Sequence, residues 1–432
     1  MSLNTTVQNL YNDKGNALFL LRNSLTSLSI AVDNLVNPIL KISEEARKHL
    51  TFNQNIAIEN AFSLRTVGLK KQLALIKEQL ALPEDKIYSN LDIIRLQLQN
   101  LRDEYLRSEM VFGYYVDLLH TRAIKDIGMV LRGYDNLARA TLKIFLSPLR
   151  YHIPWVVVYL EQIGDGAAIM RADISLWDRM KNPCAVIKMP QSNLCFPRSS
   201  IFHEAGHQVA SITGFNQEGA NLLYDTIINA GGSVSLASYW KYCAKEIVAD
   251  QIATHLTNFI GSTTLYSIYS GSVGRMFAII PKDTHLMGYL RICSNIESCK
   301  LAFGSGPWDT LKRAMDLLYA IRLAPPFSAR VINESIPILP TICKALSKTR
   351  LSCFGGRSLE EIAPMRCVSL TLVRKLLNFD LSNFSTSMKA MVQNPILTLI
   401  AFGVLHMLGR KSLYWVTDGM GKWLSALGEK EL

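Results

Sequence analysis

Residues 199 to 215 read SSIFHEAGHQVASITGF, and this stretch decides how the middle of the chain folds. It contains HEAGH at positions 203 to 207, and Glu204 is its only charged residue. A serine at either of its first two positions can cap the N-terminus of a helix, and Gly214 can end that helix. We therefore expect a largely buried helix over residues 199–213.

The two histidines of HEAGH are spaced to share one face of this helix. Side chains four residues apart lie one above the other, so His203 and His207 can present two imidazoles to one cation. Glu204 lies one step round the helix, where its carboxylate can reach a water bound to that cation without ligating it. HExxH is a moderately specific signal, and the alternative is a helix that carries two unrelated histidines. A catalytic zinc site also needs a third protein ligand and one open position.

A second stretch supplies a candidate for that third ligand. Residues 239–256 read YWKYCAKEIVADQIATHL and belong to a helix that we expect over 236–260. Glu246 and Asp250 are four apart on one face of it, among apolar neighbours that make an unpartnered acidic pair costly to bury. We therefore predict that Glu246 completes a His/His/Glu site for Zn²⁺. Asp250 would then accept the outer N–H of one ligating imidazole and fix its tautomer.

A third stretch, PKDTHLMGYLRI at 281–292, places Asp283, His285 and Arg291 after this second helix. An imidazole here can donate a hydrogen bond to the oxyanion of a tetrahedral intermediate. We predict this role for His285, with Arg291 as a second donor. The alternative is an ordinary surface histidine.

Taken together, these segments resemble the gluzincin clan of zinc peptidases. The pattern is that of the family of prenyl-protein proteases and heat-shock membrane proteases. That family carries HExxH, then E-x-x-A-D on a later helix, then a His-Pro segment with an Arg six positions after the His. The chain has HEAGH, then EIVAD at 246–250, and Arg291 six positions after His285. Leu286 replaces the expected proline, and no membrane helices accompany the motifs. The resemblance covers residues 150–295.

The resemblance implies a zincin-like α+β core that hydrolyses peptide bonds. In that mechanism Glu204 is the general base, which takes a proton from the zinc-bound water and passes it to the leaving amine. The substrate backbone would lie along the edge of a small sheet, for which Cys184–Met189 is the candidate edge strand. The letters HEAGH also occur in ATP-dependent membrane zinc proteases, where an Asp is the third ligand. Asp250 can play that part, although the chain has no Walker A loop.

Two other functions stay open at the level of sequence. One is a zinc hydrolase that acts on a non-peptide bond. The other is a helical interaction protein with a structural or vestigial zinc site. Structural zinc sites usually have four protein ligands and are rich in cysteine. HEAGH and EIVAD contain no cysteine, and the base Glu204 is present, so we favour the peptidase. We expect the other histidines to be packing or surface residues: His49, His120, His152, His255 and His406.

The chain as a whole is predicted to be mainly α. Residues 1–150 carry leucine and isoleucine stripes at alternating three- and four-residue steps, which predict a helical bundle or coiled hairpin. Residues 151–305 form the expected metallopeptidase core and hold two β-branched segments, 152–160 and 184–189, that are typical of strands. Residues 306–432 return to a helical pattern.

Composition limits the partners and the compartment. The 432 residues carry a formal net charge of +11 at pH 7. No nucleic-acid motif accompanies this charge, so we expect a solvated basic surface and a protein or peptide substrate. The N-terminal helices are the candidate surface for a homo-oligomer or a partner. Residues 395–408 are too short for a membrane span and contain His406, which favours a core helix. Eight cysteines without a CxxC pair, and a start without a secretory signal, predict reduced thiols in the cytoplasm.

Overall fold

The structure is a computed structural model, and it describes residues 13–161, 164, 166–365, 391–407, 409 and 411–430. Contacts divide the chain into two compact units. Unit 1 takes residues up to 124 together with 174–183, and unit 2 takes 125–173 together with the chain from 184 onward. Over the described residues the fold is mainly α with a small three-stranded sheet, as the sequence predicted. None of the seven described cysteines belongs to a disulfide, and Cys367 lies outside the described residues.

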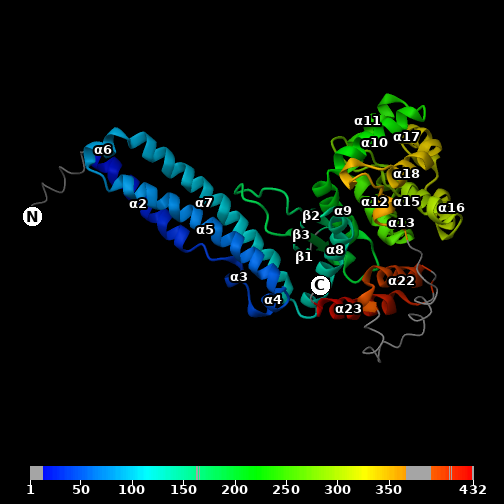
Figure 1. The fold of residues 1–432 in the computed structure, drawn as a ribbon, viewed down its shortest axis with the longest axis horizontal. Coiled ribbons are helices and arrows are strands. Elements are labelled where there is room, and N and C mark those ends of the chain that lie inside the picture. The colour runs from blue at the N-terminus through cyan, green and yellow to red at the C-terminus, as the bar shows by residue number, and fades with distance from the viewer. Residues whose placement is uncertain are drawn as a thin grey trace, which may run out of the picture. The chain divides into compact units, whose positions relative to one another are not determined.

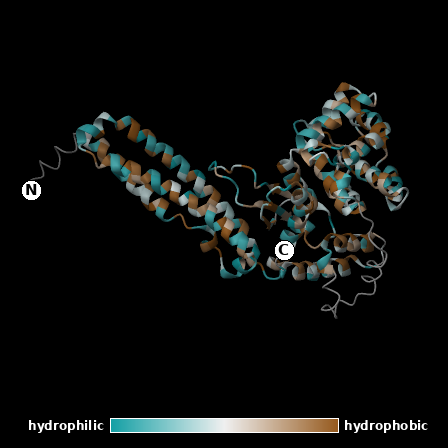
Figure 2. Ribbon diagram, in the orientation of Figure 1, coloured by the Kyte–Doolittle hydropathy of each residue, from teal (hydrophilic) through white to brown (hydrophobic). Residues whose placement is uncertain are grey.

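Three long helices form the body of unit 1. They are α2 (Asp13–Asp33), α5 (Phe52–Leu80) and α7 (Leu91–His120), which run side by side with α5 and α7 antiparallel (Figure 1). Their apolar stripes bury a common core, and hydrophobic and hydrophilic residues alternate along each helix (Figure 2). The bundle expected from the residue spacing is confirmed. The shorter elements of unit 1 are α3 (Pro38–Lys41), α4 (Glu44–Lys48), α6 (Glu84–Ser89) and the 3-10 turn η1 (Thr121–Ala123).

A segment distant in the sequence, residues 174–183, completes unit 1. The carboxylate of Asp178 pairs with the guanidinium of Arg65 on α5, and both side chains are 1% exposed. Arg65 also donates to the backbone carbonyl of Lys181 at 3.1 Å. Because a buried charge without its partner is costly, this pair ties the segment to the bundle.

The small sheet lies in unit 2 and has the strand order β1–β3–β2. β1 (Val156–Glu161) begins after Pro154, which has no N–H to give to a sheet ladder. β3 (Ala185–Pro190) pairs with β1 in parallel and with β2 (Ala168–Met170) in antiparallel orientation. The prediction that Cys184–Met189 is an edge strand is therefore wrong, because this segment forms the central strand.

Burial explains this difference. β3 is almost wholly buried, as a strand with neighbours on both sides must be. β2 is three residues long and partly exposed, so it is too short to show an alternating pattern in the sequence. β2 is the edge of the sheet on the side away from β1.

The helices that carry the predicted site pack on one another in unit 2. α8 (Gly128–Leu146) contacts β1 and α9 (Ser200–Thr213), and α9 contacts α12 (Ala244–Thr257). The helix expected over 199–213 is confirmed. The single helix expected over 236–260 is wrong, because Cys243 and Asn258 divide this stretch into α11, α12 and α13. Asn258 has a φ of +44°, which a helix cannot accommodate.

The remaining helices of unit 2 surround this pair. Between β3 and residue 365 they are α10 (Phe215–Asn229), α11 (Val234–Tyr242), α13 (Phe259–Tyr269), α14 (Val273–Phe277), α15 (Gly288–Phe303), α16 (Pro307–Leu318), α17 (Pro326–Ser335), α18 (Leu339–Lys348) and α19 (Leu359–Ile362). The 3-10 turns are η2 (Ser147–Leu149), η3 (Gln191–Asn193), η4 (Ile321–Leu323), η5 (Ile336–Ile338) and η6 (Ser352–Phe354).

The apolar segment near the C-terminus is a core helix, as predicted. It forms α22 (Pro395–Met407), which packs against α23 (Leu413–Gly428) and against α12. Its middle turns are buried. Among the described helices, none combines the length and the apolar character that crossing a bilayer requires.

Candidate metal centre

α9 carries the HEAGH segment into the interior of unit 2. Ser199 occupies the N-cap position but makes no side-chain cap, and its backbone N–H donates to Thr264 Oγ1 at 2.9 Å. The helix ends at Gly214, whose φ of +87° lies in the left-handed region that glycine adopts at little cost. Glu204 and His207 are buried on the inner side of the helix.

The glycine of HEAGH sets how closely α12 approaches α9. A Cβ at Gly206 would lie 3.1 Å from the carbonyl oxygen of Ala249 and 3.3 Å from its Cα. Both positions must therefore be small for the two helix backbones to meet at this crossing. Glu246 lies about one turn before Ala249, so the close approach brings its carboxylate over the histidines.

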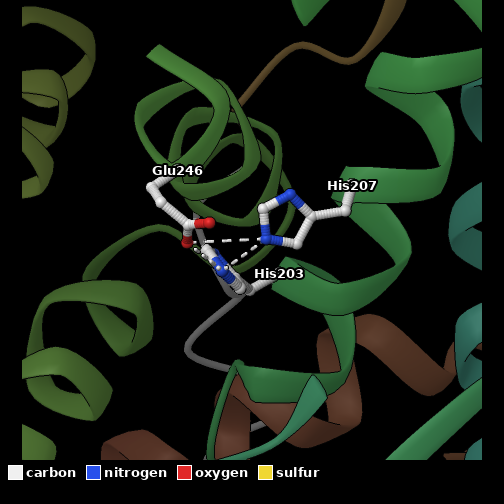
Figure 3. Close-up of side chains that lie close together, drawn as sticks. All are labelled: His203, His207 and Glu246. Atoms are coloured by element: carbon white, nitrogen blue, oxygen red, sulfur yellow. Dashed lines mark hydrogen bonds and ion pairs between the residues drawn. The ribbon is translucent and has the colours of Figure 1, made fainter. Parts of the chain in front are cut away.

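Three side chains meet between α9 and α12 (Figure 3). The Nε2 atoms of His203 and His207 are 3.1 Å apart. Oε2 of Glu246 lies 3.3 Å from Nε2 of His203 and 3.5 Å from Nε2 of His207. The three predicted ligands thus form one group, with ligand atoms within 4.8 Å of one another, that could hold a metal ion.

The separations fit a metal ion. Ligand atoms about 2.0–2.2 Å from a tetrahedrally coordinated ion lie about 3.3–3.6 Å from one another. The three observed separations are close to this range. Oε2 of Glu246 is buried and has no hydrogen-bond partner, which is costly for a carboxylate oxygen. A cation between the three atoms would satisfy it.

The charges around the centre favour a cation there. Burial disfavours a charged imidazole, but contacts with Asp250, Glu246 and Glu204 outweigh it and raise the pKa of His203 to about 10. Burial also disfavours a charged carboxylate, but the two imidazoles outweigh it and hold the pKa of Glu246 well below its ordinary value. Positive charge is therefore stabilised at the point where the three side chains meet, and a metal ion would compete with a proton for it.

Asp250 lies behind His203. Its Oδ1 is 2.9 Å from Nδ1 of His203, on the edge of the ring opposite Nε2. This is the contact expected from the sequence for an acceptor that fixes the ring. The structure brings Glu246, and not Asp250, to the two Nε2 atoms.

Arg291 braces Asp250 from the far side. Its Nε and Nη2 donate to the two oxygens of Asp250 at 2.6 and 2.8 Å, and its Nη1 donates to the hydroxyl of Tyr269 at 2.9 Å. Burial raises the pKa of Asp250, but the charge of Arg291 and the contact with His203 outweigh it and lower that pKa to about 2. The sequence suggested Arg291 as an oxyanion donor, whereas in the structure its guanidinium is committed to Asp250 and Tyr269.

His285 comes to the centre from the loop before α15. Its Nε2 lies 3.4 Å from Oε2 of Glu246, and its Nδ1 lies 2.6 Å from Oδ1 of Asp283. The side chain is 50% exposed, so it stands at the opening of the site. Asp283 orients the ring from one side, while the other ring nitrogen faces the candidate ligand Glu246.

The edge strand β2 borders the same centre, which the sequence reasoning missed. A groove of about 250 Å³ is lined by residues 167–169 and 171 at β2, by Glu204 and His285, and by all three candidate ligands. The carboxylate and the imidazoles thus border the same open space as the edge strand β2.

A buried glutamine fixes β2 to α9. Gln208 is fully buried; its Oε1 accepts from the backbone N–H of Ala172 at 2.8 Å, and its Nε2 donates to Asp173 at 2.7 Å. Ser211 donates to the other oxygen of Asp173 at 2.7 Å. The residue after His207 therefore sets the distance between the strand edge and the ligands. The sequence signal for this contact was a glutamine directly followed by the apolar Val209 and Ala210 on a helix expected to be buried.

The predicted site residues thus come together in one place. No protein-family model matches the chain, and neither the curated proteins nor the solved structures contain a match to it. Its function is therefore inferred from the geometry of the chain itself.

Proposed function

We propose that the chain is a zinc metallopeptidase in which His203, His207 and Glu246 hold Zn²⁺. Two imidazoles and one carboxylate are a donor set of catalytic zinc sites, in which the fourth position stays open. The observation that carries the proposal is the convergence of three ligand atoms, 3.1–3.5 Å apart, at a buried carboxylate oxygen without a hydrogen bond. No cysteine belongs to the group, in contrast to most structural zinc sites.

Zinc bound there would lower the pKa of a water toward neutrality and polarise a peptide carbonyl. Glu204 lines the groove beside the ligands and is not one of them. Its carboxylate takes a proton from the attacking water and passes it to the nitrogen of the leaving amine as the C–N bond breaks. The water is thereby divided between the new carboxyl group and the new amine.

His285 is placed to stabilise the oxyanion. Its Nε2 faces the centre, 3.4 Å from Glu246, and Asp283 holds Nδ1 at 2.6 Å. In its cationic form the ring keeps the contact with Asp283 and donates from Nε2 to the negative oxygen that develops on the substrate.

β2 gives the substrate backbone a place to bind. Among the described strands only β3 neighbours it, and its residues line the groove that holds Glu204 and His285. An extended peptide adds to such an edge through main-chain hydrogen bonds, which places one of its carbonyl groups over the centre. β2 thus takes the role of substrate-binding edge strand that the sequence predicted for residues 184–189 in β3.

The proposal includes membership of the gluzincin clan. HEAGH, EIVAD and the pair formed by His285 and Arg291 were matched to that pattern from separate segments, and all of them line or brace one centre. The cytoplasm remains the expected compartment.

Zinc content and peptide cleavage test the proposal together. Purified protein should bind about one zinc ion per chain and cleave members of a peptide library. Glu204→Gln should keep the zinc and lose turnover by about 10²-fold or more, and Glu246→Ala should lose the zinc. Glu429→Gln, at an exposed glutamate, is the matched control. Turnover that survives Glu204→Gln contradicts the base assignment. Zinc binding without cleavage of any peptide would favour a structural site.

A further inference from the structure

A second cavity opens beside Glu204, on the side away from His207. It has a volume of about 140 Å³ and shares His203, Glu204 and His285 with the groove along β2. A side chain of a peptide bound in that groove can therefore reach it. His207 and Glu246 do not line it, so an occupant would not displace these two ligands.

The walls and the floor of this cavity differ in polarity. Ala253, Leu265 and Ile268 give it apolar walls. Asn295 on α15 also lines it, is 1% exposed, and has a side-chain oxygen without a hydrogen-bond partner. Thr254 lies next to this asparagine, and its buried hydroxyl oxygen likewise lacks a partner. Buried polar atoms are nearly always paired, so these two point to a ligand or a water that completes them.

Gly261 holds the two polar groups together. A Cβ at this position would lie 3.1 Å from Oγ1 of Thr254 and 3.2 Å from Nδ2 of Asn295. The hydroxyl and the amide are therefore both close to one glycine that also lines the cavity. Together they offer donors and acceptors to a neutral polar group.

The charges that line the cavity disfavour an acidic occupant, because the Glu204 carboxylate is one of them. Arg291 and Asp250 also line it, but they neutralise each other through two hydrogen bonds of 2.6 and 2.8 Å. An acidic side chain would enter beside the Glu204 carboxylate without a counter-ion and would lose its hydration. The volume also sets a limit, because a cavity of about 150 Å³ holds a molecule the size of benzene. One side chain of intermediate size fits, and an indole does not.

We propose that this cavity binds the side chain of the residue next to the cleaved bond, and that it selects glutamine. The methylene groups would lie against Leu265 and Ile268, and the terminal amide would pair with the side-chain amide of Asn295. This inference rests on the proposed peptidase function and names its substrate class. Leucine has a similar size but leaves the side-chain amide of Asn295 unpaired, and glutamate brings a second carboxylate next to Glu204.

Peptides that differ only at the residue beside the cleaved bond test the selection. With zinc-loaded full-length protein, kcat/KM should be at least about tenfold higher for glutamine than for leucine or glutamate. Asn295→Leu keeps the volume and removes the amide, so it should abolish the preference over leucine. Asn229→Leu, at an exposed asparagine of α10, is the matched control and should change nothing. Equal cleavage of the glutamine and leucine peptides by wild type overturns the proposal, as does a preference that persists in Asn295→Leu.

Two further measurements keep the outcome decisive. If Asn295→Leu does not fold, Ala253→Val can replace it, because the larger side chain narrows the cavity. This variant should cleave the glutamine peptide more slowly, relative to a peptide with glycine at that position, than wild type does. The Glu204→Gln variant separates the selection from the peptidase function, because it should bind the glutamine peptide more tightly than the leucine peptide without cleaving either. If wild type cleaves nothing while this binding preference is present, the peptidase assignment fails and the side-chain site stands. If cleavage occurs without any preference, the side-chain site fails alone.

Discussion

Replacing Asp250 by asparagine measures how far the centre depends on the ion pair behind it. The change keeps the shape of the side chain and removes a charge to which Arg291 donates two hydrogen bonds, at 2.6 and 2.8 Å. Both residues are 5% exposed. Removing one partner of a buried pair costs about 3–5 kcal/mol, because the other charge stays buried. The zinc affinity should fall about 10- to 100-fold as well, since His203 loses the acceptor that holds its ring.

The pKa of Asp250 gives a second magnitude and its direction with pH. The contacts lower this pKa from 3.8 to about 2, and one pKa unit corresponds to about 1.4 kcal/mol. The ionised carboxylate thus contributes on the order of 2 kcal/mol, fully present above pH 4 and lost as the pH falls toward 2. The difference in unfolding free energy between wild type and Asp250→Asn should narrow across that window.

Chemical unfolding of metal-free protein between pH 7 and pH 2.5 checks both figures. Asp225→Asn, at an exposed position of α10, is the control for the loss of one negative charge. The double variant Asp250→Asn, Arg291→Met removes both charges and should recover much of the stability that the single variant loses. A loss below about 1 kcal/mol at pH 7, the range of an exposed ion pair, would refute the reasoning. So would a difference that does not change with pH.

Three further predictions concern the assembly of the centre. Gly206→Val should lower the unfolding free energy by about 1–3 kcal/mol and weaken zinc binding, because it pushes α12 away at Ala249. Gly113→Val, where a Cβ meets nothing within 4 Å, should leave zinc binding unchanged. Gln208→Ala should raise KM for peptides more than it lowers kcat, because it releases β2 from α9; steady-state kinetics that show an unchanged KM would count against this. The raised pKa of His203, about 10, means that a proton competes with zinc at neutral pH. The apparent zinc affinity should therefore rise by up to about tenfold per pH unit between pH 7 and 9, and competition with a chelating dye whose affinity is known at each pH measures it.

The candidate ligands could be predicted from the sequence because their geometry is local. His203 and His207 share a helix face whatever surrounds the helix, and so do Glu246 and Asp250. The apolar residues around both pairs indicated that the two faces are buried. That the helices cross at Gly206 and Ala249 was not visible, because it depends on the packing of two separate segments.

The features that escaped prediction depend on contacts between distant segments. A three-residue strand such as β2 is too short to show an alternating pattern of apolar residues. The order of strands in a sheet cannot be read from the sequence of any single strand. Cys184–Met189 was recognised as a strand, but only its pairing on both sides identifies it as central. The break at Asn258 requires a positive φ that its neighbours impose, and a helix pattern continues through it in the sequence.

The Arg65–Asp178 pair affects how the two units can be expressed separately. The polypeptide passes from β2 through residues 174–183, which belong to the bundle, before it returns to β3. A fragment that stops at residue 124 would leave the buried guanidinium of Arg65 without its carboxylate partner. A fragment that starts at residue 125 would contain the loop of residues 174–183 without the bundle against which they pack. Isolated expression of either half is better attempted with that loop grafted onto the helices and replaced by a short turn between β2 and β3.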